Sequence, residues 1–285
     1  MLVSLNYRLR GSIIETFDPR ARWIFSLLFL FAIVQFWDVR ILAFFFFLAV
    51  LQYILTRLTW RETRRAWILI SVIVFSMVFF NTLLSSSGTI GTVMQGGTPV
   101  FNLDFRVPLF GWNIEFVITD RRLWFALGQV LRIYSIALLF MVIPFTMDPR
   151  QYGVTFKGLG LSDRLAFTMD LAFRFIPTLT RDFSTTLDAQ RARGYEIERG
   201  SGGLIAQIRR VAPLIIPVTM NSLLTGEDVV NAMDLRCFGL QPRTWLETLR
   251  YHWHDYALIA FGVLILAAAL ILNNVYQIGD VWMPA

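Results

Sequence analysis

Residues 23–37 read WIFSLLFLFAIVQFW and residues 41–55 read ILAFFFFLAVLQYIL, with only three residues between them. Each run holds 15 residues, which is about 22 Å of α-helix, and flanking residues can lengthen both. Trp23 and Trp37 bound the first run, and indole rings are enriched at membrane–water interfaces. Two apolar helices joined by so tight a turn predict a helical hairpin inside a bilayer.

The chain as a whole is too apolar for a soluble domain. Of its 285 residues, 56% are hydrophobic and 16% are charged, whereas a soluble protein of this length needs more polar residues to cover its surface. Further apolar runs of bilayer-crossing length occupy residues 66–84, 123–145 and 256–272. We therefore predict an all-α polytopic membrane protein with about five transmembrane helices.

These runs divide the chain into segments of different character. The expected segments are a cytoplasmic N-terminal segment at 1–22, four transmembrane helices within 23–145, an extracytoplasmic loop at 85–122, a mixed coupling-helix segment at 146–255, and a last transmembrane helix with a short external tail at 256–285. Loose alternation of apolar and polar residues at 100–105 and 111–119 predicts a hairpin outside the membrane. Helical spacing of apolar residues in the mixed segment predicts amphipathic helices at the membrane surface.

Arginine sets both the charge and the expected orientation. The net charge is +6, and Lys157 is the only lysine. The arginines lie beside apolar runs, so membrane topology explains them better than a nucleic-acid partner. The short arginine-rich stretch at 57–65 places its turn in the cytoplasm, which puts the N-terminus inside and the C-terminus outside.

A near-repeat occupies the mixed segment. Residues 189–195 (AQRARGY) are echoed by residues 232–238 (AMDLRCF). Aligned on Arg193 and Arg236, each copy has an alanine four residues earlier, a small residue next and then an aromatic. On a helix the alanine and the arginine share a face, so a partner's backbone can approach a projecting guanidinium closely. We interpret the two copies as contacts for a soluble partner.

The near-repeat resembles the paired Ala-Arg-Gly motifs of the T component (EcfT/CbiQ type) of energy-coupling factor (ECF) transporters, the group that includes cobalt-transporter permeases. Residues 192–194 match the first motif, whereas residues 235–237 keep the second arginine and differ at both neighbours. The resemblance implies that each arginine inserts into a groove on one of two cytoplasmic ABC ATPase subunits. The residues assigned to ATPase coupling are Ala192, Arg193, Gly194, Arg236 and Cys237, with Arg191 as an auxiliary.

The resemblance also implies a separate, small substrate-binding membrane subunit for vitamin or metal-ion uptake, in a prokaryotic inner or plasma membrane. The chain has no Gly-x-x-x-x-Gly-Lys-Ser/Thr motif, so ATP hydrolysis is expected of the partners and this chain is expected to be non-catalytic, without a cofactor. Two alternatives belong to other classes. A membrane enzyme would need Asp163, Asp170, Asp182 and Asp188 to converge. A conventional permease half of an ABC importer would carry a Glu-Ala-Ala coupling loop, which we do not find.

Polar residues elsewhere have two interpretations each. Arg132 and Gln129 lie inside the fourth run, one turn apart. They either form a site that docks the substrate-binding subunit or steadies the bundle, or Arg132 snorkels or is paired internally, which we favour. His252 and His254 with Asp255 form a His-x-His-Asp sequence. Side chains two apart diverge on a helix, so we expect an interfacial belt for the last helix and no metal site.

Overall fold

The computed structural model describes residues 11–84, 99–107, 112–194, 204–241 and 244–276. The chain divides into two compact units, each treated separately below. The first, which we call the bundle unit, comprises Asn6–Asp148 and Arg250–Ala285. The second, which we call the crossed-helix unit, comprises Pro149–Leu249.

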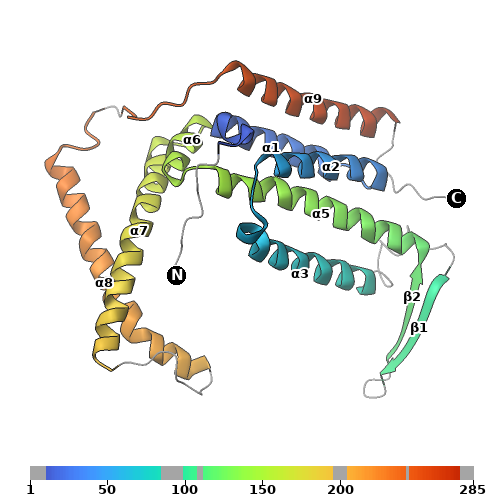
Figure 1. The fold of residues 1–285 in the computed structure, drawn as a ribbon, viewed down its shortest axis with the longest axis horizontal. Helices are drawn as coiled ribbons and strands as arrows, with labels where there is room; N and C mark the ends of the chain where they lie inside the picture. Colours follow the sequence, from blue (N-terminus) through green and yellow to red (C-terminus); the bar gives the residue numbers. More distant parts are fainter. Residues whose placement is uncertain (1–10, 85–98, 108–111, 195–203, 242–243, 277–285) are drawn as a thin grey trace. The chain divides into compact units, whose positions relative to one another are not determined.

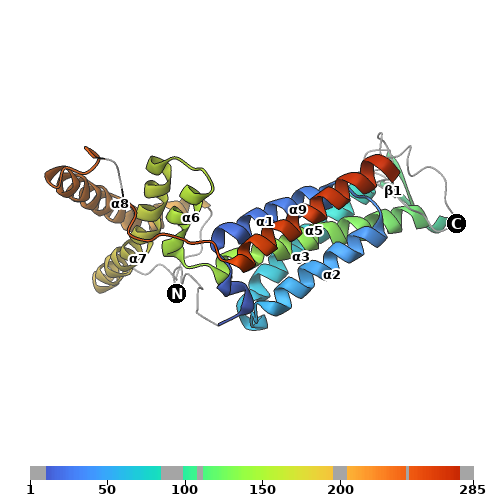
Figure 2. The same cartoon turned by 90° about the horizontal axis from the view of Figure 1, so that it is seen from above.

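The bundle unit consists of long apolar helices lying side by side (Figures 1 and 2). Its helices are the short η1 (Ile13–Thr16), α1 (Pro19–Val34), α2 (Val39–Leu55), α3 (Trp60–Leu84), α5 (Asp120–Thr146) and α9 (Trp253–Tyr276). Helix α5 contacts α1, α2 and α3, and α9 packs along α1. The prediction of an all-helical membrane protein is confirmed for the apolar part of the chain.

Helix α1 begins four residues before the apolar run that revealed it. Asp18 is its N-cap and accepts a hydrogen bond from the Arg20 amide at 2.8 Å, and Pro19 holds the first helical position. Proline suits that position because its missing N–H would have no partner within the helix. Arg22, one turn in, is buried and donates to the Thr146 hydroxyl at 2.9 Å. The helix therefore starts at its cap, and only its later part is the apolar run.

The predicted tight turn is present. Helix α1 ends at Val34 and α2 starts at Val39, with Asp38 as N-cap accepting from the Arg40 amide at 2.8 Å. Inside the hairpin the rings of Phe29 and Phe45 meet edge to face with centroids 5.0 Å apart. Together with the fully buried Leu42 and Leu138 they form the centre of the apolar core.

Within the part of the chain that the structure describes, three helices have both the length and the apolarity needed to cross a membrane. They are Trp60–Phe80 within α3, Leu123–Thr146 within α5, and Trp253–Val275 within α9. Val39–Leu55 is a shorter apolar helix of 17 residues, and α1 has 16. At 1.5 Å per residue the two short helices span about 24–26 Å, against a hydrocarbon core of about 30 Å. The expectation of about five transmembrane helices thus meets three helices of full length and a shorter apolar hairpin, whose crossing of the membrane stays a prediction.

A two-stranded hairpin interrupts the helical pattern. Strand β1 (Pro99–Val107) pairs antiparallel with β2 (Trp112–Thr119), and β2 leads directly into α5. The expected hairpin is therefore confirmed, and it adds a strand element to an otherwise helical chain. Its placement outside the membrane stays a prediction.

The crossed-helix unit takes its name from two long helices that cross each other (Figure 1). It contains the short η2 (Pro149–Gln151), α6 (Tyr152–Gly158), α7 (Asp163–Ala192) and α8 (Leu204–Leu235). The prolines Pro213 and Pro217 both lie inside α8 without ending it. Helix α6 approaches α7 closely at Gly153, where a Cβ would stand 2.8 Å from the Ala166 carbonyl oxygen.

Candidate functional site

The first arginine of the near-repeat ends helix α7. Arg193 is the C-cap, and its amide donates to the Ala189 carbonyl at 3.3 Å. Gly194 follows with φ of 80°, and its amide donates to the Arg191 carbonyl at 2.9 Å. Glycine reaches this left-handed conformation without a Cβ clash, so it stops the helix immediately after the arginine.

The second arginine ends helix α8 in the same way. Arg236 follows Leu235, the last residue of α8, and Cys237 then takes φ of 54°. The Phe238 amide donates to the Met233 carbonyl at 3.0 Å, and the Cys237 amide to the Asp234 carbonyl at 2.9 Å. These are the two bonds of a Schellman helix ending. Gly194 and Cys237 therefore differ in residue type but share a positive φ directly after the arginine.

Both arginines are exposed at the ends of their helices. Among the described residues, neither the Arg193 nor the Arg236 guanidinium has an ion-pair partner. A positive side chain at a helix C-terminus is favoured by the helix dipole, so each arginine is stable there while it projects outward. Arg191 differs, because its Nη1 lies 3.6 Å from the Asp188 carboxylate. Ala192 is exposed beside Arg193, and Cys237 is an exposed free thiol beside Arg236.

The two helices place their arginines far apart. Helices α7 and α8 run in opposite directions, since Gln190 contacts the Pro213 carbonyl and Asp182 accepts from Asn221 at 3.1 Å. Phe238, just past the end of α8, packs on Phe167 near the start of α7, with ring centroids 4.9 Å apart. From Phe167 to Arg193 the helix rises about 39 Å. The crossed-helix unit thus offers two separate arginine-tipped ends.

A clasp holds the chain that follows α8. The Lys157 ammonium lies 2.8 Å from the Asp163 carboxylate and 5.0 Å from the centre of the Trp245 ring. The Trp245 indole N–H donates to the same carboxylate at 3.3 Å. This clasp and the Phe167–Phe238 contact fix the segment just after Arg236 against the start of α7. Sequence reasoning missed both contacts. Trp245 is far along the chain from Lys157 and Asp163, and Phe238 is far from Phe167.

The aspartates needed by an enzymatic interpretation do not meet. Asp163 belongs to the clasp, and Asp182 accepts from Asn221. Asp170 pairs with Arg174 at 3.4 Å, and Asp188 with Arg191. The four carboxylates therefore lie along α7 with different partners, and no shared catalytic centre forms among them.

Arg132 is paired inside the bundle unit. Its guanidinium donates to the Phe36 carbonyl and covers the Trp37 ring, with 4.0 Å from Cζ to the ring centre. Trp37 in turn stacks on Phe125 at 5.3 Å. Gln129, one turn before Arg132, is buried. This geometry favours the interpretation of Arg132 as an internally paired arginine, and it ties α5 to the turn between α1 and α2.

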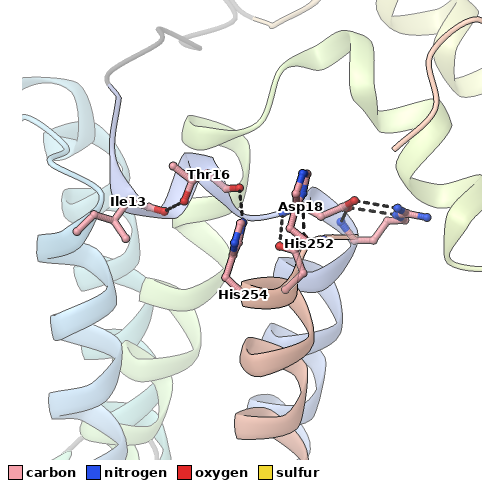
Figure 3. Close-up of polar contacts among 7 residues, drawn as sticks. Ile13, Thr16, Asp18, His252 and His254 are labelled. Carbon is pink, nitrogen blue, oxygen red and sulfur yellow. Dashed lines mark hydrogen bonds and ion pairs between the residues drawn. The ribbon is translucent and has the colours of Figure 1, made fainter. Parts of the chain in front are cut away.

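The two histidines lie closer together than their spacing suggested. Because His252 precedes the first residue of α9, its ring stacks on that of His254 with centroids 5.3 Å apart (Figure 3). The expectation that the rings diverge on a helix is therefore wrong. Asp255 is fully buried, and its two oxygens accept the amides of Asp18 and His252, each at 2.7 Å. The Asp255 carboxylate thus joins the start of α1 to the start of α9, with one oxygen bonded to each.

Further side-chain contacts lie around the junction of α1 and α9. The Arg20 guanidinium pairs with the Asp18 carboxylate at 2.8 Å and covers the Tyr251 ring at 3.9 Å. Burial is the main cause that raises the pKa of Tyr251. His254 Nε2 lies 3.3 Å from the Thr16 carbonyl. The polar groups at the start of α9 therefore serve helix capping and helix docking.

Comparisons with known proteins agree on one family. The model of the cobalt transport protein family, CbiQ, matches residues 12–246. The energy-coupling factor transporter transmembrane protein EcfT of Lactobacillus helveticus is 28% identical over 273 residues, 92% of this chain and 89% of that protein. EcfT of Lacticaseibacillus paracasei is 38% identical over 109 residues, 38% of this chain and 40% of that protein.

A third relative carries an ATPase name. It is a Bifidobacterium longum protein named for ABC transporter ATP binding, 33% identical over 188 residues, or 63% of this chain and 22% of that protein. The family match spans both arginine-tipped helix ends and most of the bundle. The chain therefore belongs to the CbiQ family and is a transmembrane component of an energy-coupling factor transporter in a prokaryotic cell membrane.

Proposed function

We propose that this chain is the coupling scaffold of an ECF-type importer, in which Arg193 and Arg236 each bind one of two cytoplasmic ABC ATPase subunits. The observation that carries the proposal is the shared helix ending: an exposed arginine at the end of a long helix, followed at once by a residue with positive φ. The helix ends there, so no further turn of helix surrounds the guanidinium.

Arginine chemistry suits such a contact. The guanidinium keeps its charge at any relevant pH and pairs with a carboxylate through two parallel hydrogen bonds. Neither guanidinium is paired among the described residues, so a partner's acid does not have to displace an internal one. The small residues beside Arg193 allow the helix end to enter a groove deeply.

Two separated ends favour two partner subunits. Phe167 lies beside the end of α8, where Arg236 stands, and about 39 Å of helix separates Phe167 from Arg193. A single groove therefore cannot accept both arginines. The Bifidobacterium longum protein, of which 22% resembles this chain, is itself named as a putative ABC transporter ATP-binding protein. A relative with that name supports an association of this chain with ABC ATPases.

The rest of the proposal follows the same logic. ATP-driven closure of the two ATPases moves the arginine-tipped helices, and the crossed-helix unit passes that motion to a small, separate membrane subunit that binds a vitamin or metal ion. In this arrangement residues 1–22 and 146–255 are cytoplasmic and the loop at 85–122 is external. The bundle unit anchors the assembly in the bilayer.

Co-purification tests the proposal directly. Tagged full-length protein is purified in mild detergent as wild type, Arg193→Ala, Arg236→Ala and the double variant, and the retained ATPase subunits are quantified. Arg181→Ala is the matched control, since Arg181 is an exposed arginine of α7 outside the near-repeat. Each single variant should retain less ATPase and the double variant essentially none, because central charge contacts often contribute 2 kcal/mol or more to binding.

Two results would contradict the proposal that Arg193 and Arg236 bind the ATPase subunits. One is a double variant that retains ATPases as well as wild type. The other is an equal loss in Arg181→Ala, which would indicate a general effect of positive charge. The location of α7 and α8 in the cytoplasm is tested separately by labelling Cys237, the single cysteine, from either side of sealed vesicles.

A further inference from the structure

Helix α3 has one face toward the bundle and one away from it. On the inner face the Thr63 hydroxyl meets the Tyr53 hydroxyl at 2.9 Å, the Ser71 hydroxyl meets that of Tyr134 at 2.8 Å, and Val74 is buried. On the outer face large apolar side chains are exposed. They include Ile68, Leu69, Val72, Ile73 and Phe75. Figure 1 shows α3 at the edge of the bundle, so its outer face is turned away from the other helices of this unit.

Three arginines continue this outer face at the start of the helix. Arg61, Arg64 and Arg65 are all exposed. Residues four apart lie on one face, so Arg64 stands one turn before Ile68 and Arg65 one turn before Leu69. The arginines therefore lie on the same helix face as the apolar stripe, one turn before it begins.

The three arginines share the first turns of α3 with a single acid, Glu62. Among the described residues, none of the three guanidinium groups forms an ion pair or a side-chain hydrogen bond. Arg61 and Arg65 are four apart, a spacing at which like charges repel. All three stand near the N-terminus of α3, the positive end of the helix dipole. An external anion would relieve both repulsions.

We propose that Arg61, Arg64 and Arg65 form a binding surface for the headgroups of anionic phospholipids. The apolar stripe of α3 contacts the acyl chains of the same lipid layer whose phosphates the arginines meet. Trp60, which is 61% exposed, precedes the cluster and suits the interfacial layer. Arginine binds phosphate through its planar fork, and basic residues at a membrane surface attract anionic lipid.

Native mass spectrometry of the full-length protein tests this surface. Wild type and Arg64→Gln/Arg65→Gln are offered equal amounts of phosphatidylglycerol and phosphatidylcholine in detergent at low salt, and the bound lipids are counted. The matched control, Arg164→Gln/Arg181→Gln, removes the same charge from exposed positions of α7. We expect the preference for phosphatidylglycerol to fall roughly fivefold for each arginine removed from α3, and Arg64→Lys/Arg65→Lys to keep most of it.

The outcomes separate lipid from the other anionic partners. Displacement of phosphatidylglycerol by inorganic phosphate would overturn the lipid assignment in favour of a free anion site. Unchanged lipid selectivity with loss of co-purified ATPase would assign the cluster to a protein surface instead. An equal loss in the α7 control would also overturn it. Retention of ATPases through Arg193 and Arg236 is measured in the same samples, and its failure leaves the lipid result standing.

Discussion

Gly194 and Cys237 occupy equivalent positions, each directly after the arginine at the end of a long helix and each with positive φ, 80° and 54°. Glycine adopts this conformation freely, whereas cysteine carries a Cβ that clashes with the backbone there. The conserved feature of the two copies is thus a helix ending that presents an arginine, and Cys237 keeps that ending at a cost.

Substitutions at these two positions should therefore change stability in opposite directions. Cys237→Gly relieves a left-handed conformation and should stabilise the protein by about 1 kcal/mol. Gly194→Ala introduces the same penalty and should destabilise it by about 1 kcal/mol. Thermal unfolding in detergent measures both. A shift of the same sign in both variants would show that backbone conformation at these positions does not set the stability of the helix ends.

Replacement of the motif arginines by lysine separates charge from geometry. Arg193→Lys and Arg236→Lys keep the positive charge at the helix end but lose the planar fork. If ATPase contact needs the fork, each variant should bind ATPase at least about tenfold more weakly, a loss of roughly 1.4 kcal/mol. Affinity is measured with purified ATPase subunits on immobilised protein. Wild-type affinity in both lysine variants would mean that charge alone suffices.

Removal of the Arg132 guanidinium should weaken the bundle without releasing a partner. Arg132→Met keeps a long side chain but leaves the Phe36 carbonyl without its donor, which costs about 1–3 kcal/mol for a buried group. Unfolding temperature reports this loss. Retention of the substrate-binding subunit, measured well below that temperature, should equal wild type. Selective loss of that subunit at unchanged stability would assign Arg132 to docking instead.

Asp255 is expected to be the most sensitive position at the start of α9. Asp255→Ala leaves the buried amides of Asp18 and His252 without acceptors, so we expect a loss of about 2–4 kcal/mol. Asp255→Asn keeps one carbonyl oxygen and should lose about half as much. Neighbouring His254→Gln is the control, because its exposed ring contacts Thr16, Phe17 and His252 but holds no buried amide; it should change stability by less than about 0.5 kcal/mol.

Two glycines distinguish tight packing from helix propensity. Gly153→Ala places a Cβ 2.8 Å from the Ala166 carbonyl oxygen and should destabilise the crossed-helix unit by about 1–3 kcal/mol. Gly226→Ala, inside α8 with nothing within 4 Å, should stabilise it by about 0.5–1 kcal/mol. Urea unfolding followed by circular dichroism gives both values. Equal effects would show that α6 does not pack on α7 as described.

The apolar runs predicted the long helices because burial in lipid imposes both length and composition on a segment. The apolar run at 123–145, for instance, predicted α5, which extends over Asp120–Thr146. The near-repeat also revealed Arg193 and Arg236, because a short local pattern specifies a helix end. Cys237 was judged a departure from that pattern, since residue type alone does not show that its φ is positive.

Contacts between distant segments escaped prediction. The Asp18–Asp255 bond, the Lys157–Trp245 contact and the Phe167–Phe238 pair each join residues from different elements. One local signal was available: Asp255 stands three residues after His252, the spacing at which an acid caps the start of a helix. Recognition of this capping position would have predicted that Asp255 is buried and bonded to the His252 amide.

The bond between the Asp18 amide and Asp255 also bears on how the chain is made. Its two residues are 237 positions apart, and at 5–20 residues per second a ribosome needs roughly 10–50 s to travel between them. During that interval α1 is in the membrane without the helix that packs along it, and the start of α1 lacks its acceptor. Closure of the bundle therefore waits until α9 has been made, and a chain that stops short of α9 leaves the nascent bundle open.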